Sequence, residues 1–184
     1  MKFTALAIPG LILIEPRILK DPRGIFLESY RRDLFTQNGI SEEFVQDNQS
    51  CSCFGVLRGL HYQVEPHAQA KLVSVLKGKV FDVAVDIRPD SKTFGKYAGL
   101  TLDGERRQML YVPKGFAHGF CALEDGTEFL YKVSDYYSPG HERGIIWNDA
   151  DLGIEWPKMN YIISEKDKKY PRLREVFGAN PSRK

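Results

Sequence analysis

The strongest constraint on this chain is its rhythm of short β-type runs separated by turn residues. Few stretches hold a helical period, whereas alternating, β-branched and aromatic runs recur along the chain. The expected strands are 11–15, 25–30, 44–52, 56–62, 72–76, 79–87, 96–102, 107–112, 119–123 and 128–133. Turn pairs such as Lys77-Gly78 and Asp103-Gly104 between them suit the hairpins of a sandwich or barrel. Because strands and helices do not alternate, the pattern predicts an all-β protein.

The remaining segments predict little additional structure. One short helix is expected over 33–37, with Asn38-Gly39 as its stop. After Gly140 the strand rhythm fades, and Trp147, Trp156 and several prolines suggest a C-terminal segment wrapped over the outside of a barrel. A chain of 184 residues can bury one core, and neither a repeat nor a linker divides it. We therefore expect a single domain over residues 1–184.

The charge balance excludes broad electrostatic attraction. Lys and Arg total 26 and Asp and Glu total 24, so the net charge is +2. Such a chain has no wide field to attract nucleic acid or an anionic membrane, and any anion site must be local. The apolar run 11–14 is too short to span a bilayer, and no signal-peptide pattern precedes it. We expect a cytoplasmic protein with neither nucleic acid nor membrane as a partner.

Three cysteines, Cys51, Cys53 and Cys121, show neither zinc-ribbon nor redox spacing. Alternation places Cys51 and Cys53 on the same face of a strand. We expect these two to be small thiols of the core.

Two histidine-containing segments, 55–61 and 113–118, resemble in order and separation the two signature motifs of the cupin barrels. In metal-binding cupins the first motif continues to a second histidine and then a glutamate, because a divalent metal needs about four converging ligands. Here Gln63 stands at the position of that histidine, and His67 or Ala68 stands at that of the glutamate. The resemblance implies a cupin-type jelly-roll barrel with short peripheral helices.

The incomplete ligand set changes the expected chemistry. His61 and His118 alone would bind a metal weakly and without selectivity, so we expect no metal and no other cofactor. A histidine in a metal-free barrel mouth is a natural general base, because its ordinary pKa lies near neutrality.

Ten pieces of the sequence are informative when taken together and in order: 21–28, 46–48, 56–63, 71–73, 81–86, 115–120, 131–132, 142, 147–149 and 164–167. As a set they are similar to the dTDP-4-dehydrorhamnose 3,5-epimerases. One piece alone is weak evidence, whereas ten in order are specific. The resemblance implies an isomerase that converts dTDP-4-dehydro-6-deoxy-D-glucose to dTDP-4-dehydro-L-rhamnose, a step of dTDP-L-rhamnose synthesis.

The resemblance also implies catalytic roles. His61 would be the base, and Asp167 would bond its far ring nitrogen and stabilise the imidazolium. Lys71 would stabilise negative charge at the C4 oxygen of the enolate. Tyr131 would return a proton on the opposite face.

Strand alternation conflicts with one part of this assignment. Arg58 and His61 differ by three positions, so a regular strand would turn them to opposite faces. Gly59 must therefore supply a bulge or twist if both are to point inward.

Substrate contacts are implied by the same resemblance. Donors for a diphosphate are expected from Arg23, Gln46, Asn48, Arg58 and Lys166. Glu28 of the neighbouring subunit is expected to bind the nucleotide portion of the substrate. Glu142 and His118 are expected to make further substrate contacts. Tyr136 or Tyr137 could stack on the thymine, and the sequence does not choose between them.

A homodimer is expected through an N-terminal strand that pairs with the neighbouring sheet, because strand 11–15 would otherwise leave an exposed edge. Two alternative functions stay open. One is a related nucleotide-sugar 3- or 5-epimerase, against which Tyr131 favours a route that includes C5. The other is a non-catalytic cupin that binds a sugar nucleotide.

Overall fold

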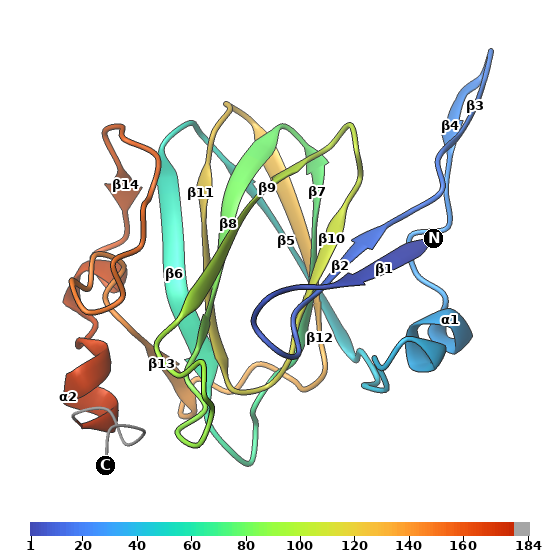
Figure 1. Cartoon of the computed structure of the whole chain (residues 1–184). Helices are drawn as coiled ribbons and strands as arrows, with labels where there is room; N and C mark the ends of the chain where they lie inside the picture. Colours follow the sequence, from blue (N-terminus) through green and yellow to red (C-terminus); the bar gives the residue numbers. More distant parts are fainter. Residues whose placement is uncertain (179–184) are drawn as a thin grey trace.

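Two antiparallel sheets face each other in the computed structural model, which describes residues 1–178 (Figure 1). The first sheet contains, in spatial order, β1 (Lys2–Ala5), β2 (Ile12–Glu15), β10 (Met109–Val112), β7 (Lys71–Lys77), β12 (Thr127–Val133) and β5 (Gln46–Ser52). The second contains β13 (Glu142–Gly144), β6 (Val56–Gln63), β11 (Phe116–Ala122), β8 (Lys79–Asp86) and β9 (Tyr97–Asp103), with β14 (Ile162–Ile163) parallel to β6. Together they form the expected jelly-roll barrel.

Short elements surround the barrel. The hairpin of β3 (Leu19–Asp21) and β4 (Gly24–Phe26) projects from the body, and α1 (Arg32–Gln37) follows it (Figure 1). The 3-10 turn η1 (Asp167–Lys169) and helix α2 (Leu173–Phe177) lie in the C-terminal segment. The all-β prediction with short peripheral helices is therefore confirmed.

Each of the expected strands overlaps an observed one, and the differences lie at the ends. Strand β11 begins at Phe116, so His118 lies within a strand that was expected to start only at residue 119. The expected strand 25–30 is reduced to the end of β4. Strands β1, β3, β13 and β14 and helix α2 were not expected, because elements of two to five residues carry no readable period.

Period-two burial divides the core into an interior and an outer layer. In β8, Val80 and Ala84 pack between the sheets with Phe129, whereas Val83 and Val85 pack on the outside. The interior cluster closes the barrel, and inward positions that are polar line the pocket described below.

The C-terminal segment covers the outer face of the second sheet, as expected from the loss of strand rhythm after Gly140 (Figure 1). Trp156 and Leu173 join Leu57 and Cys121 in one buried cluster there. This layer brings η1 beside β6, where it can supply a residue to the barrel interior.

The expectation that strand 11–15 leaves a free sheet edge is wrong. Strand β2 pairs with β1 on one side and with β10 on the other. Segment 2–5 folds back as a strand of its own, which the sequence pattern did not reveal, and it occupies the edge that motivated the dimer prediction.

The expected burial of Cys51 and Cys53 is also wrong, since both are exposed. Cys51 lies on β5 and Cys53 follows directly after it; β5 is the edge strand of its sheet, and its inward positions are polar ones such as Asn48. Cys51 occupies the opposite, solvent-facing side of β5.

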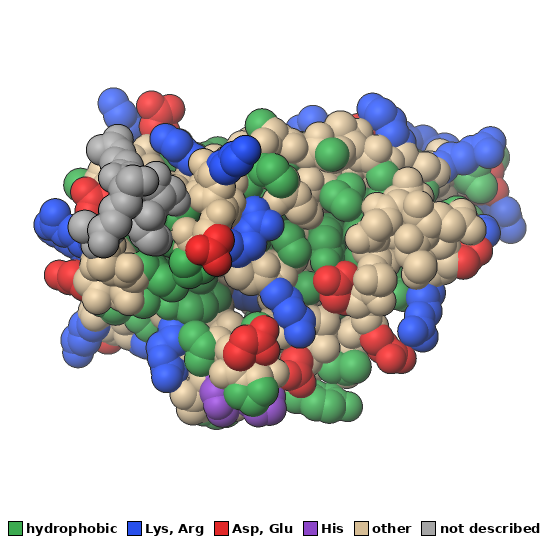
Figure 2. Space-filling view, turned by 60° about the horizontal axis from the view of Figure 1, so that its bottom comes forward, with side chains coloured by type: hydrophobic (Ala, Val, Ile, Leu, Met, Phe, Trp, Pro, Cys, Tyr) green, Lys and Arg blue, Asp and Glu red, His purple; other side chains and the backbone are tan. Residues whose placement is uncertain are grey.

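Basic and acidic side chains are interspersed on the surface seen in Figure 2, as the near-neutral charge balance predicts. Among residues 1–178, the structure contains no helix of the length and apolarity needed to cross a membrane.

Candidate active site

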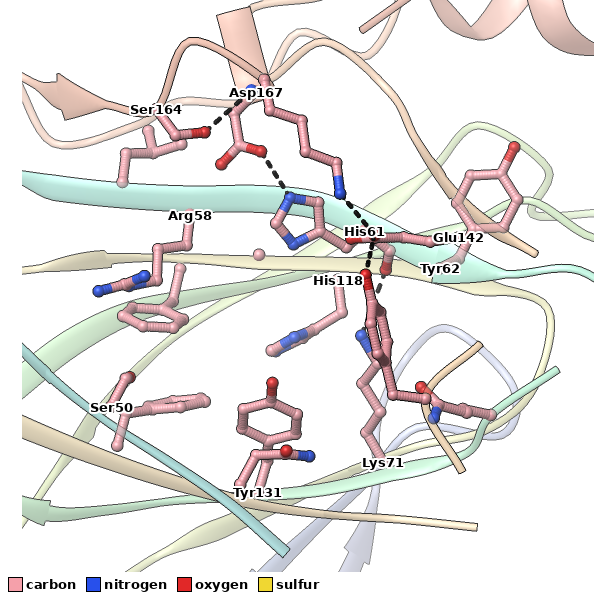
Figure 3. Close-up of a pocket in the computed structure, with 18 of the residues that line it drawn as sticks. Ser50, Arg58, His61, Tyr62, Lys71, His118, Tyr131, Glu142, Ser164 and Asp167 are labelled. Atoms are coloured by element: carbon pink, nitrogen blue, oxygen red, sulfur yellow. Dashed lines mark hydrogen bonds and ion pairs between the residues drawn. The ribbon is translucent and has the colours of Figure 1, made fainter. Parts of the chain in front are cut away.

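A pocket of about 990 Å³ opens between the two sheets, which is at the upper end of the size range of small-molecule sites (Figure 3). Its walls come from β5, β7 and β12 of the first sheet and from β6 and β11 of the second. The C-terminal segment completes it. The predicted site residues that line it are Gln46, Asn48, Arg58, His61, Lys71, His118, Tyr131, Glu142, Lys166 and Asp167.

His61 and Asp167 form a hydrogen-bonded dyad, with 2.7 Å between His61 Nε2 and Asp167 Oδ1. The other Asp167 oxygen accepts the Gly59 N–H at 3.3 Å, and the Asp167 N–H donates to Ser164 Oγ at 3.0 Å. Burial opposes ionisation of Asp167, but the bonds from His61 and its other donors outweigh burial and hold the pKa of this carboxyl below its ordinary value. The ionised carboxylate therefore fixes the imidazole, whose Nδ1 faces the pocket (Figure 3).

The predicted irregularity at Gly59 is confirmed. Arg58 pairs with Phe120 and His61 pairs with His118. Between these two pairs β6 advances by three residues and β11 by two, which is a β-bulge. The backbone of Gly59 has φ of +119°, in the region that favours glycine. The extra residue turns both Arg58 and His61 toward the pocket.

Tyr131 enters from the facing sheet. It lies on β12 opposite Asn48 of β5, and its hydroxyl points into the pocket (Figure 3). Burial raises the pKa of Tyr131, the charge of Glu142 raises it further, and Arg58 partly opposes both. A phenol in this setting keeps its proton at neutral pH and can donate it.

Lys71 lies on β7 beside the dyad, and its Nζ donates to the His61 carbonyl oxygen at 3.3 Å. Burial lowers the pKa of Lys71 to about 8, although the negative charges of Asp82 and Glu142 oppose that shift. A cation without full hydration is well suited to stabilise an anionic oxygen in the pocket.

Asp82 is a site residue that the motifs did not assign. It is fully buried on β8, and its oxygens lie 3.0 and 2.9 Å from His118 Nε2. The available signal was a carboxylate inside the otherwise apolar run 80–85, because such a charge must find a partner when its strand is buried. This bond holds the His118 ring in the pocket wall.

Glu142, Lys166 and Tyr137 form a polar cluster, and Glu142 lies beside His61 in the pocket (Figure 3). Glu142 Oε2 accepts hydrogen bonds from Lys166 Nζ and, at 2.7 Å, from the Tyr137 hydroxyl. Although burial would raise the pKa of Glu142, these two donors lower it below its ordinary value. Tyr137 lines the pocket whereas Tyr136 does not, so the structure brings Tyr137 to the site.

A row of uncharged donors lies on the edge strand β5. Gln46 Nε2 donates to Asn48 Oδ1 at 2.8 Å, and both residues face the pocket. Arg58 extends toward the same strand, with Nε 3.3 Å from Ser52 Oγ.

Arg23 and Glu28 do not join the pocket of their own chain. The Arg23 side chain is 91% exposed on the projecting hairpin and is paired with Asp21 at 2.6 Å. Glu28 lies just beyond that hairpin, 3.9 Å from Arg31. The hairpin also exposes Phe26, to 66%.

Tyr170 is another residue near the site to which the sequence motifs assigned no role. Its ring meets the His61 ring edge-on at 5.7 Å between centroids, and it lies directly over Gly144. A side chain at position 144 would collide with this ring, so Gly144 gives Tyr170 its place beside the dyad.

Within residues 1–178, no group of three or more His, Cys, Asp or Glu side chains is arranged to hold a metal ion. Gln63, which stands where metal-binding cupins have their second histidine ligand, has a side-chain amide that is hydrogen-bonded to backbone groups.

Comparison with known proteins agrees with this geometry. The family model described as dTDP-4-dehydrorhamnose 3,5-epimerase matches residues 5–175. The enzyme of that name from Shigella flexneri is 53% identical over 161 residues, which is 87% of this chain and 89% of the relative. The structure of dTDP-6-deoxy-D-glucose-3,5-epimerase from Legionella pneumophila in complex with dTDP-4-keto-L-rhamnose superimposes with a TM-score of 0.92 at 46% identity, covering 95% of this chain and 94% of that one.

Enzymes with a narrower specificity share the fold. A 3'-monoepimerase from Streptomyces bikiniensis, in complex with dTDP-quinovose, matches with a TM-score of 0.89 at 35% identity over 95% of this chain and 90% of that one. The fold alone therefore does not separate the two specificities, whereas the sequence identity is higher to the 3,5-epimerases. On the family match over 5–175 and on this identity, the chain belongs to the dTDP-4-dehydrorhamnose 3,5-epimerase family.

Proposed function

We propose that this chain converts dTDP-4-dehydro-6-deoxy-D-glucose to dTDP-4-dehydro-L-rhamnose by inverting C3 and C5. The observation that carries the proposal is the entry of the His61–Asp167 dyad and the Tyr131 hydroxyl into one pocket from opposing walls. Inversion next to a ketone needs a base on one face of the sugar and an acid on the other, and these two walls offer both.

The first half of the reaction uses the dyad. Nδ1 of His61 takes the proton from the carbon next to the C4 ketone, so the C–H electron pair forms an enolate with its charge on the C4 oxygen. Asp167 holds the ring in orientation and stabilises the imidazolium, as the carboxylate of a histidine–aspartate pair does in other enzymes. A positioned base of this kind contributes about 10²- to 10⁴-fold in rate.

Lys71 stabilises the enolate, and His118 contacts the sugar. Lys71 supplies positive charge beside the dyad, and the oxyanion is the species that gains most from it. His118, held by Asp82 through Nε2, presents the other edge of its ring as a polar contact for the sugar.

The second half uses the facing wall. The Tyr131 hydroxyl gives its proton to the opposite face of the enolate carbon, which leaves a tyrosinate and an inverted centre. Proton exchange with water then returns Tyr131 and His61 to their starting states. Both C3 and C5 flank the same ketone, so the same base can remove both protons. We assign the Tyr131 proton to C5, and the proton returned to C3 comes from solvent.

The nucleotide end is held by the polar part of the pocket. Arg58 and Lys166 bind the diphosphate, with Gln46 and Asn48 as neutral donors. We assign the stacking on thymine to Tyr137 rather than to Tyr136, because Tyr137 lines the pocket.

The projecting hairpin provides the intersubunit part of the proposal. Arg23 and Glu28 lie outside their own pocket, beside the exposed Phe26, so we propose that they complete the pocket of a partner subunit in a homodimer. The dimer then forms through β3 and β4 rather than through β2.

Mixing two inactive variants tests this arrangement. His61→Ala leaves the hairpin intact, whereas Arg23→Ala leaves the dyad intact, so a mixed dimer regains one complete pocket. Activity of the mixture above that of either variant is expected, with light scattering to establish the dimer. A monomer at micromolar concentration, or a mixture no more active than its components, would contradict the proposal.

Turnover of dTDP-4-dehydro-6-deoxy-D-glucose, coupled to a reductase that accepts only the epimerised product, tests the function itself. Solvent deuterium at both C3 and C5 of the product is the expected result, read by NMR. Deuterium at C3 alone would favour the 3-epimerase alternative. Tight binding of dTDP without any exchange would favour the non-catalytic cupin.

A further inference from the structure

Gln63 is a buried polar residue that the proposed chemistry does not use. It ends β6, and only 7% of it is exposed. Both ends of its side-chain amide are hydrogen-bonded to backbone. Nε2 donates to the carbonyl oxygens of His67 at 2.7 Å and Tyr136 at 3.2 Å, and Oε1 accepts the Ser138 N–H at 2.7 Å.

Two of these bonds reach residues 134–138, the first part of the connection between β12 and β13, which we call the tyrosine segment. Its beginning is anchored separately, because Gln69 Nε2 donates to the Asp135 carbonyl oxygen at 2.7 Å. Its end is anchored by Gln63 on either side of Tyr137, through the carbonyl of residue 136 and the N–H of residue 138.

The Tyr137 side chain is thereby directed into the pocket. Its hydroxyl donates to Glu142 Oε2 at 2.7 Å, and its N–H donates to Gln46 Oε1 at 3.0 Å. Because Tyr137 is 53% exposed, packing alone provides little to hold it, so its position depends on its own two hydrogen bonds and on the bonds of Gln63 to the backbone on both sides of it.

We propose that Gln63 is a positioning residue that holds the tyrosine segment so that Tyr137 is preformed for the nucleotide end of the substrate. The inference rests on the proposed function in that it assigns that end of the pocket to dTDP. Gln63 then contributes to binding rather than to proton transfer. At the position where metal-binding cupins have a ligand, this chain has a side chain that organises a loop.

The chemistry of the side chain supports this role. An amide supplies a donor to two carbonyls and an acceptor to one N–H at the same time. A carboxylate of the same length keeps the acceptor and loses both donated bonds, and it is repelled by the two carbonyl oxygens. Alanine loses all three and leaves the backbone groups of residues 67, 136 and 138 without this partner.

Gln63→Ala and Gln63→Glu test the proposal, with Gln108→Ala as the matched control. Gln108 is 9% exposed, its Nε2 donates to Glu15 Oε1 at 3.2 Å, and it lies outside the pocket. We expect both Gln63 variants to weaken dTDP binding by about tenfold in calorimetry, a typical effect of losing interactions to a buried polar group. The KM for the nucleotide sugar should rise in parallel, with kcat within about twofold of wild type. Gln108→Ala should leave both constants unchanged.

A double-mutant cycle with Tyr137→Ala identifies the route of the effect. If Gln63 acts through Tyr137, Gln63→Ala adds little to the dTDP affinity loss already caused by Tyr137→Ala. Full additivity of the two losses would overturn the proposal, as would a fall in kcat or in deuterium exchange at unchanged dTDP affinity. So would a lowered Tm in both glutamine variants with dTDP affinity intact.

Failure of the function and failure of this inference give different results. Wild-type protein that binds dTDP but turns over no sugar contradicts the function, while the calorimetric comparison still tests Gln63. Normal turnover together with unchanged dTDP affinity in both Gln63 variants contradicts only the inference. Gln63→Glu serves as the folded variant should the alanine variant not fold.

Discussion

His61 and His118 lie opposite each other on neighbouring antiparallel strands, and each is hydrogen-bonded through Nε2 to a buried carboxylate. The two dyads differ in access to the pocket. The His61 side chain is 30% exposed, whereas that of His118 is 7% exposed. The open ring can approach a carbon acid and the enclosed ring can only contact the sugar, which is why we assign the base to His61.

Replacement of His61 should stop both proton transfers. His61→Ala is expected to lower turnover by about 10²- to 10⁴-fold and to suppress solvent deuterium uptake at C3 and at C5, because neither proton can leave without the base. Asp167→Asn should resemble a weaker version, since the ring loses its oriented carboxylate but keeps its basic nitrogen. Uptake at normal rates in His61→Ala would remove His61 from this role.

Replacement of Tyr131 should separate exchange from inversion. In Tyr131→Phe, His61 still removes and returns protons on its own face, so deuterium exchange continues while net inversion at C5 falls. Quantifying label and configuration in the same NMR sample measures both. Complete loss of exchange in Tyr131→Phe, equal to that in His61→Ala, would show that Tyr131 does not act only as the acid.

The pKa of Lys71 predicts an alkaline limit of activity. Its pKa lies at about 8, below the ordinary lysine value, so the ammonium is mostly charged at pH 7 and is lost as pH rises through about 8. If the charged form stabilises the enolate, kcat should fall over that window. Lys71→Gln should be slower at every pH and should lack this fall, and an unchanged alkaline limb in Lys71→Gln would assign the limb to another group.

Chelation should leave activity intact. The chemistry proposed here uses side chains alone, and Gln63, at the position of a cupin ligand, is committed to backbone groups. Turnover after prolonged EDTA treatment and buffer exchange is expected to equal that of untreated protein. Activity lost to EDTA and restored by one particular metal would contradict the prediction.

The sequence was most informative where a feature depends on the spacing of residues along one strand or segment. Strand alternation located the barrel strands, and the conflict between Arg58 and His61 correctly indicated a bulge at Gly59. The C-terminal covering layer followed from the end of strand rhythm. These features depend on local spacing, which a sequence displays directly.

The features that were missed depend on contacts between distant segments. Strand β1 exists because it pairs with β2, so its four residues have no signal of their own. Asp82 belongs to the site through His118, which lies 36 residues away in the chain. The choice of Tyr137 over Tyr136 is set by the backbone bonds to Gln63, and no local pattern distinguishes two adjacent tyrosines.

The most demanding test of the bulge is a methyl group at Gly59. A Cβ there would lie 2.6 Å from Gly119 Cα and 2.8 Å from the His118 carbonyl oxygen, and both contacts are with backbone that cannot turn aside. The φ of +119° adds strain for any other residue. Strain of this kind costs about 1–3 kcal/mol, and forcing atoms into a packed interior costs a similar amount.

Gly59→Ala should therefore lower the free energy of unfolding by several kcal/mol in denaturant titration and should also disturb the Gly59 N–H bond to Asp167 at 3.3 Å. Any folded fraction should lose activity more than it loses dTDP binding, because the bulge orients His61. Gly140→Ala is the matched control, since a Cβ at residue 140 meets nothing within 4 Å. A Gly59→Ala protein as stable and as active as Gly140→Ala would mean that β6 can orient the dyad without the bulge.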